Sequence, residues 1–127
     1  MNTETIDGAT LENWGAQELY DAHKRGEVVI IDVRTPQEYA FEHIHGALLA
    51  PMATFDPKDL PSQEGKPIVF HCGSGKRSHR VAEACIKAGF SKIAHLAGGF
   101  AAWKQAGLPY VAIDPANGSQ RVVGSAS

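Results

Sequence analysis

The sequence has few of the features that mark secreted, membrane or nucleic-acid-binding proteins. Its 127 residues include only two cysteines, and no apolar run approaches the length of a membrane-spanning helix. The formal net charge is −2, so no basic excess is available for nucleic acid or an anionic membrane surface. The opening segment, MNTETIDGAT, lacks the cationic and apolar parts of a signal peptide. We therefore expect a cytoplasmic protein that has neither nucleic acid nor membrane as a partner.

The two cysteines, Cys72 and Cys85, are expected to be separate thiols rather than a disulfide. If a helix begins near Arg77, its rise of about 1.5 Å per residue places Cys85 about 12 Å along it, beyond the reach of a disulfide to the preceding loop. Cys85 falls on the apolar face of that helix and is expected in the core. A resolving thiol is the alternative if the helix is oriented differently.

Two apolar runs rich in β-branched residues indicate the central strands of a parallel sheet. These runs are VVIIDV (Val28–Val33) and PIVFHC (Pro67–Cys72), and both are continuous rather than alternating, as strands covered on both faces require. Weaker patterns predict short strands over residues 46–50 and 93–96. Helices are expected over residues 15–25, 35–42 and 77–88, and around Phe100 and Trp103.

The alternation of strands and helices predicts one open α/β domain over residues 10–109. A lead-in of residues 1–9 precedes this domain, and an extension of residues 110–127 follows it. Small and polar residues dominate the last dozen positions, which we expect to be poorly ordered. The helix after the first strong strand begins with Thr35 and Pro36, and Glu38 is interpreted as its capping-box acid.

The segment HCGSGKRSHR (His71–Arg80) is the strongest candidate for a catalytic site. Cys72 ends a predicted strand, and sites in open α/β sheets form at the carboxyl ends of strands. The glycine-rich residues that follow can curl so that backbone N–H groups point inward, with a helix N-terminus behind them. Such an anion cradle lowers the thiol pKa and holds an anionic substrate over the thiolate. A buried, inert cysteine is the alternative interpretation.

The predicted nucleophile of this site is Cys72, and no separate general base is required because the cradle already ionises the thiol. Positive charge on Lys76 and Arg77 is expected to orient the substrate. The predicted substrate-binding residues are Gly73, Ser74, Gly75, Lys76, Arg77 and Ser78.

Four motifs carry a resemblance to a known family. They are IDVRTPQEY (Ile31–Tyr39), HIHGA (His43–Ala47), CGSGKRS (Cys72–Ser78) and GGFAAWKQAGLP (Gly98–Pro109), in this order. On these motifs the chain over residues 10–109 resembles a single-domain rhodanese, a sulfurtransferase. The resemblance implies an open parallel five-stranded sheet with helices on both faces. It also implies a cysteine that takes a sulfane sulfur from a donor such as thiosulfate, becomes a persulfide and passes the sulfur to a thiophilic acceptor.

The length of the cysteine loop separates this family from its fold relatives. The spacing from Cys72 to Arg77 is C-x4-R, whereas related phosphatases and arsenate reductases use the longer C-x5-R. The first hypothesis is therefore an enzyme that uses an anionic donor and a thiol or cyanide as acceptor. The alternative is a sulfur-relay or adaptor domain for a protein partner, and phosphatase or arsenate reductase chemistry ranks third. One departure from the family pattern is His45, where many relatives have proline.

Asp32 and Arg34 end the first strong strand on the same sheet edge as Cys72. We expect them to fix loops near the site through an ion pair rather than to act in catalysis. Three histidines, His43, His45 and His71, raise the question of a metal site. Consecutive residues of a strand point to opposite faces, so His71 and Cys72 are poorly placed to share an ion. We predict neither a metal nor a cofactor.

Overall fold

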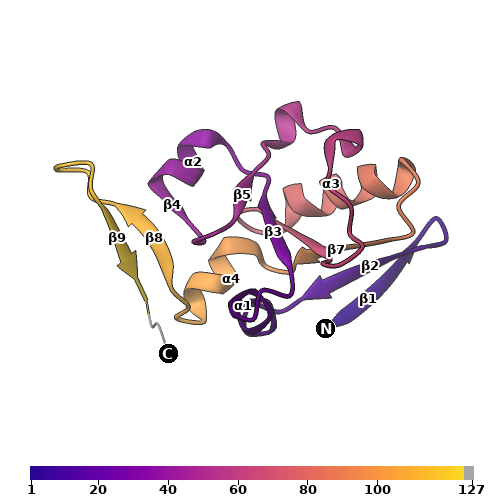
Figure 1. Ribbon diagram of the computed structural model, residues 1–127, viewed down its shortest axis with the longest axis horizontal. Coiled ribbons are helices and arrows are strands. Elements are labelled where there is room, and N and C mark those ends of the chain that lie inside the picture. Colours follow the sequence, from indigo (N-terminus) through magenta and orange to yellow (C-terminus); the bar gives the residue numbers. More distant parts are fainter. Residues whose placement is uncertain (125–127) are drawn as a thin grey trace.

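The central sheet of the protein has six strands in the order β1-β2-β7-β6-β3-β5 (Figure 1). In the computed structural model, which describes residues 1–124, five of these strands run parallel and β1 pairs antiparallel with β2. The predicted parallel five-stranded sheet is thus confirmed, with one added antiparallel edge strand. The strands are β1 (Asn2–Ile6), β2 (Ala9–Trp14), β7 (Lys92–Leu96), β6 (Ile68–His71), β3 (Val29–Asp32) and β5 (Leu48–Leu49).

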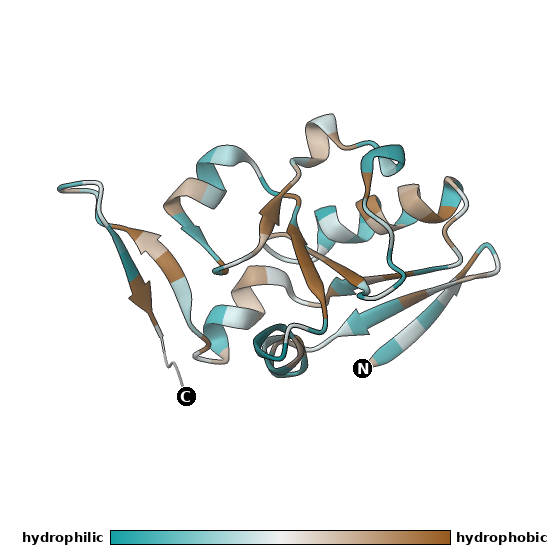
Figure 2. Ribbon diagram, in the orientation of Figure 1, coloured by the Kyte–Doolittle hydropathy of each residue, from teal (hydrophilic) through white to brown (hydrophobic). Residues whose placement is uncertain are grey.

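Helices cover both faces of this sheet because the central strands are apolar on both sides, as the brown central strands in Figure 2 show. One face packs against α1 (Ala16–Lys24) and α4 (Gly99–Gln105), where the rings of Tyr20 and Trp103 meet edge to face at 5.6 Å. The other face packs against α3 (Lys76–Lys87), whose buried residues include Cys85. The short helices are α2 (Pro36–Phe41) and the 3-10 turns η1 (Met52–Thr54) and η2 (Pro57–Asp59).

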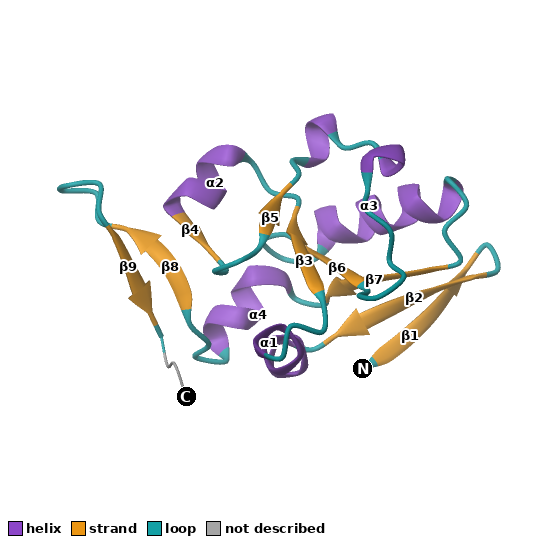
Figure 3. Cartoon of the chain, in the orientation of Figure 1, coloured by secondary structure: helices purple, strands orange, loops and turns teal. Residues whose placement is uncertain are grey.

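The two chain ends are more structured than the sequence predicts. The lead-in of residues 1–9 contains β1, which forms a hairpin with β2 through a turn at Asp7 and Gly8. The expectation of a poorly ordered end is wrong for residues 116–124. That stretch contains β9 (Gln120–Val123), which pairs with β8 (Tyr110–Ile113) and belongs to a second sheet in the order β4-β8-β9 (Figure 3). Residues 125–127 of the expected tail lie outside the described residues.

The second sheet forms because β8 has a partner on each side. On one side it pairs with β4 (Glu42–His43), and on the other with β9, whose turn is closed by the Asp114 N–H donating to the Ser119 carbonyl at 2.7 Å. Side chains of β9 are largely exposed, so backbone pairing rather than apolar burial stabilises this strand. No helix within residues 1–124 is long and apolar enough to cross a membrane.

Candidate active site

Cys72 lies immediately after β6, and a short glycine-rich turn leads from it into α3. The backbone N–H of Gly75 donates to Cys72 Sγ at 3.0 Å. Gly75 has a φ of +101°, a left-handed conformation that glycine adopts without steric cost. Cys72 has 0% of its surface exposed and belongs to the apolar cluster on the α3 face of the sheet.

The environment of Cys72 favours the thiolate more than the environment of an ordinary cysteine does. Burial raises the pKa of Cys72, but hydrogen bonds to the sulfur outweigh burial and lower the pKa below its usual value. The donors are the backbone N–H groups of Ser78, Gly75 and Ser74, together with the Ser78 hydroxyl when it donates. These donors are among the predicted substrate-binding residues, Gly73 to Ser78.

Cys85 has the opposite environment. It is fully buried on the apolar face of α3, and burial raises the pKa of its thiol to about 12. Both cysteines are free thiols, which confirms the prediction that they are not paired. Cys85 therefore stays protonated at neutral pH and packs as a small apolar side chain.

The first residues of α4 form hydrogen bonds to the backbone of the cysteine turn. The Phe100 N–H donates to the Cys72 carbonyl at 2.8 Å, and the Ala101 N–H donates to the Gly73 carbonyl at 3.0 Å. The first N–H groups of a helix have no acceptor within the helix, so they need acceptors outside it. Gly99 lies so close to the turn that a Cβ atom there would be 2.6 Å from the Cys72 carbonyl oxygen. Gly98 and Gly99 belong to the motif GGFAAWKQAGLP, but nothing in that motif predicts this contact.

Arg77 is held by an acid that the sequence assigned only to a helix cap. Its guanidinium donates to both carboxylate oxygens of Glu38, at 2.7 and 3.0 Å. Glu38 does complete the capping box with Thr35, so the carboxylate serves both contacts. Hydrogen bonds from Arg77 lower the pKa of Glu38 to about 2, although partial burial opposes the shift. Lys76 and Arg80 border a cleft of about 470 Å³ beside the turn and form no ion pair within residues 1–124.

Glu38→Gln is expected to lower the free energy of unfolding by about 1 kcal/mol at pH 7, because the pair is about one-third exposed and solvent screens it. The folded-state pKa of Glu38, about 2, lies below the ordinary 4.5, so the carboxylate stabilises the fold above about pH 4.5. That contribution is lost as the pH falls toward 2. Urea unfolding of both proteins across this range measures it. A deficit that stays constant as the pH falls would show that charge is not its cause.

Asp32 and Arg34 form a buried ion pair at the carboxyl end of β3. The Arg34 guanidinium donates to both Asp32 oxygens, with the shortest contact at 2.9 Å, and also to the Glu42 carbonyl at 2.7 Å. The guanidinium carbon lies 4.7 Å from the centre of the Phe100 ring. The pair therefore joins β3 to β4 and α4 beside the cysteine turn, as a support for neighbouring segments.

The three histidines considered for a metal lie in separate places. His43 stacks on Tyr39 with ring centres 4.1 Å apart, and the His45 carbonyl accepts a hydrogen bond from His23 Nε2 at 2.7 Å. His71 is fully buried, and burial lowers its pKa, so the ring is neutral at pH 7. Within residues 1–124 no group of three or more histidine, cysteine, aspartate or glutamate side chains could hold a metal ion.

A chain of polar groups leads from the buried Cys72, Ser78 and His95 to the half-buried Asn13 and the exposed Glu4, and the sequence predicts no role for it beyond Ser78. Ser78 Oγ lies 3.6 Å from Cys72 Sγ and 2.9 Å from His95 Nδ1. His95 Nε2 lies 2.7 Å from Asn13 Oδ1, and the Asn13 amide donates to Glu4 at 3.0 Å. The chain thus connects the cysteine to β7, β2 and β1.

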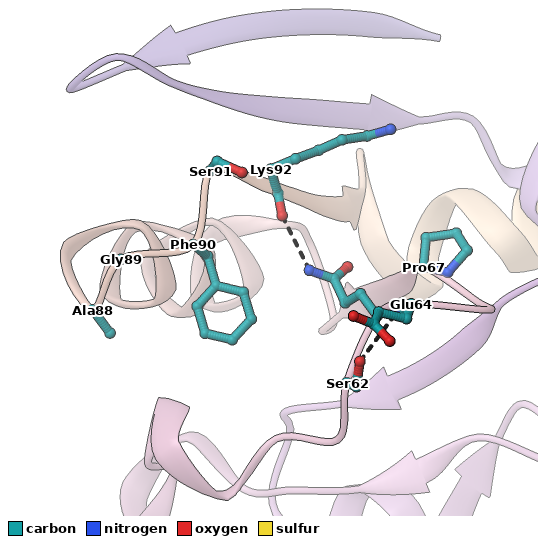
Figure 4. Close-up of a pocket in the computed structure, with 9 residues that line it drawn as sticks. Ser62, Glu64, Pro67, Ala88, Gly89, Phe90, Ser91 and Lys92 are labelled. Carbon is teal, nitrogen blue, oxygen red and sulfur yellow. Dashed lines mark hydrogen bonds between the residues drawn. The ribbon is translucent and has the colours of Figure 1, made fainter.

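A cavity of about 680 Å³ lies at the opposite edge of the sheet, where β6 and β7 begin (Figure 4). It is lined in part by Ser62, Phe90 and Lys92. Gln63 spans the two strands there, donating to the Lys92 carbonyl at 3.1 Å and accepting from the Ile68 N–H at 3.0 Å. No cysteine is among the residues that line this cavity, and Cys72 lies at the opposite, carboxyl ends of the strands.

The fold and the cysteine turn define a class of protein: an open α/β sheet with a cradled thiol at its carboxyl edge. The sequence profile of the Rhodanese-like domain matches residues 15–106. The chain therefore belongs to the rhodanese-like family, and its homologues are rhodanese-like sulfurtransferases.

Three similar proteins illustrate this relationship. Thiosulfate sulfurtransferase GlpE of Coxiella burnetii is 34% identical over 87 residues, which cover 68% of this chain and 81% of that protein. The uncharacterized protein slr1261 of Synechocystis is 42% identical over 93 residues, or 73% of this chain, and the match spans about half (52%) of its length. The solution structure of the rhodanese-like domain of Alr3790 from Anabaena has a TM-score of 0.69 at 27% identity, and covers 91% of this chain and 92% of that one.

Proposed function

We propose that the protein is a sulfurtransferase that carries sulfane sulfur as a persulfide on Cys72, from an anionic donor such as thiosulfate to a thiol or cyanide. The observation that carries the proposal is the Gly75 N–H directed at Cys72 Sγ at 3.0 Å, within a turn whose donors favour the thiolate. Lys76 and Arg80 border the adjacent cleft and supply positive charge for an anionic donor. The similarity to GlpE, which is named a thiosulfate sulfurtransferase, supports thiosulfate as the donor to test first.

The reaction would proceed in two displacement steps. The Cys72 thiolate attacks the outer sulfur of thiosulfate, a new S–S bond forms, and sulfite leaves with the electron pair of the broken bond. Cyanide or an acceptor thiolate then attacks the outer sulfur of the persulfide, and the Cys72 thiolate leaves. Because Cys72 has no exposed surface at rest, contact with the donor requires a local shift of the atoms that cover it.

The turn would also stabilise the persulfide. The outer sulfur of a persulfide is anionic, and the same N–H groups that face Sγ can donate to a sulfur bound beyond it. Arg77 lies near enough to interact electrostatically with the ionised sulfur, while Glu38 keeps its guanidinium in place. In this proposal Arg77 supports the charge of the site from a fixed position.

The proposal is tested by intact mass spectrometry after brief exposure to thiosulfate. We expect wild-type protein to gain one sulfur atom and to lose it on addition of cyanide. Cys72→Ala should gain none, whereas Cys85→Ala should load and discharge as wild type does, since Cys85 is a buried thiol with a raised pKa. Absence of sulfur on the wild-type protein, or a gain that persists in Cys72→Ala, would refute the proposed function.

A further inference from the structure

The hydroxyl of Ser78 lies between the nucleophile and a buried histidine. Ser78 Oγ is 3.6 Å from Cys72 Sγ, 2.9 Å from His95 Nδ1 and 3.2 Å from the Gly75 carbonyl oxygen. A hydroxyl has one proton, so it can donate to only one of these neighbours at a time. Ser78 is fully buried and His95 is 4% exposed, so solvent offers no replacement for a lost partner.

Asn13 determines which nitrogen of His95 carries the proton. Asn13 and His95 are paired neighbours on the parallel strands β2 and β7. The Asn13 amide nitrogen donates to Glu4 Oε2 at 3.0 Å, which directs Asn13 Oδ1 at His95 Nε2, 2.7 Å away. An amide oxygen only accepts, so Nε2 is the donor. Burial, with His79 nearby, lowers the pKa of His95 to about 4, so near pH 7 the ring is neutral and Nδ1 is an acceptor.

We propose that His95, oriented by Asn13, is a positioning residue that turns the Ser78 hydroxyl away from Cys72 and so partly opposes the stabilisation of the thiolate by the N–H donors of the turn. While Cys72 is protonated, its S–H donates to Ser78 Oγ, and the Ser78 O–H donates to His95 Nδ1, so each group has a partner. When the sulfur loses its proton, the Ser78 hydroxyl must turn to donate to the thiolate. His95 Nδ1 is then a buried acceptor without a donor, and this cost opposes ionisation.

The restraint acts on the unloaded protein only. A loaded Cys72 carries a second sulfur on Sγ and has no S–H proton for Ser78 to accept. The thiolate is the form of cysteine that oxidants attack, so the restraint also limits oxidation of the empty nucleophile. The inference concerns the nucleophile of the proposed sulfur transfer and rests on that function for its biological meaning.

Other titratable groups lie near His95 and the sulfur and act on the sulfur through space; among them, Glu4 is also linked to His95 through Asn13. His79 on α3 places its ring 5.6 Å from the His95 ring, and Glu4 lies 3.7 Å from His79 Nε2. Glu83 accepts a hydrogen bond from His79 Nδ1 at 2.9 Å. Arg77 interacts electrostatically with the ionised sulfur. A through-space effect of these groups does not depend on the Ser78 hydroxyl, which separates it from the effect of His95.

The test is a pH titration of the thiolate by its ultraviolet absorbance, with Cys72→Ala as the baseline. His95→Phe is expected to lower the apparent pKa of Cys72 by about one unit, the worth of one buried hydrogen bond. In a Ser78→Ala background the same substitution is expected to change nothing, because the hydroxyl that transmits the effect is absent. If His95→Phe does not fold, Asn13→Ala takes its place in the test. This substitution allows the other His95 tautomer, so it should also lower the apparent pKa of Cys72.

His79→Gln is the matched control, since it removes a neighbouring imidazole that has no hydrogen bond to Ser78. It should leave the apparent pKa of Cys72 within about 0.3 units of wild type. A rise in the apparent pKa of Cys72 in His95→Phe, or a shift that persists in the Ser78→Ala background, would overturn the proposal. Sulfur loading of wild-type protein is measured separately. If loading fails, the sulfurtransferase proposal fails, whereas intact loading with unchanged titration refutes only the role of His95.

Discussion

Arg34→Leu is expected to lower the free energy of unfolding by about 3 to 5 kcal/mol. The substitution leaves the Asp32 carboxylate, 0% exposed, without the guanidinium that donates to both of its oxygens. His71 lies 3.4 Å from this carboxylate, but burial lowers the pKa of that ring and keeps it neutral. The Glu42 carbonyl also loses its donor. Chemical denaturation at pH 7 measures the loss.

A double substitution distinguishes an unpaired charge from lost packing. In Asp32→Asn combined with Arg34→Leu, the neutral amide can still accept from the residue 34 N–H, as the Asp32 carboxylate does at 2.9 Å. No charge then remains buried, so the double variant is expected to recover a substantial part of the stability lost in Arg34→Leu. If it is as unstable as the single variant, the buried charge is not the cause.

The fold is predictable from the sequence where side chains are buried on both faces of a strand. The continuous apolar residues of β3 and β6 have no other stable location than the centre of a covered sheet. The edge strands β1 and β9 are different, because they are held by backbone pairing and their side chains are mostly exposed. Their sequences therefore carry no apolar pattern. The dipeptide Asp7-Gly8, with positive φ at both residues, was an available signal for the first hairpin.

The candidate site also has a part that the sequence predicts and a part that it does not. The thiol of Cys72 and its N–H donors lie within one short segment, so the glycines and the helix start that follow them predict a cradle. His95 and Asn13 are 82 positions apart in the chain and meet only because β2 lies beside β7. No local spacing encodes that neighbour relation. The contact of Glu38 with Arg77, 39 positions apart, was missed for the same reason.

Gly99→Ala is expected to slow sulfur loading from thiosulfate by about 100-fold, the scale of loss when a reacting group is misplaced by about 1 Å. Gly99 has a φ of +61°, and a Cβ atom there would lie 2.6 Å from the Cys72 carbonyl oxygen and 2.7 Å from the Gly73 carbonyl. These neighbours are backbone atoms of the cysteine turn, so the turn itself must move. Its hydrogen bonds to Phe100 and Ala101 and the Gly75 contact with the sulfur are then disturbed together.

Gly107→Ala supplies the matched control. It also places alanine in a left-handed backbone conformation, but its Cβ atom does not clash with neighbouring atoms. Gly107 has a φ of +74°, and within residues 1–124 no heavy atom other than those of Gly107 and its chain neighbours lies within 4 Å of the position that a Cβ atom would take, so alanine there meets open space. Both variants should lose about 1 to 2 kcal/mol of stability from the left-handed backbone. Only Gly99→Ala should also lose sulfur loading and show a raised pKa of Cys72, as its N–H donors move away from the sulfur. Loading of Gly99→Ala at the wild-type rate would show that α4 does not position the cysteine turn.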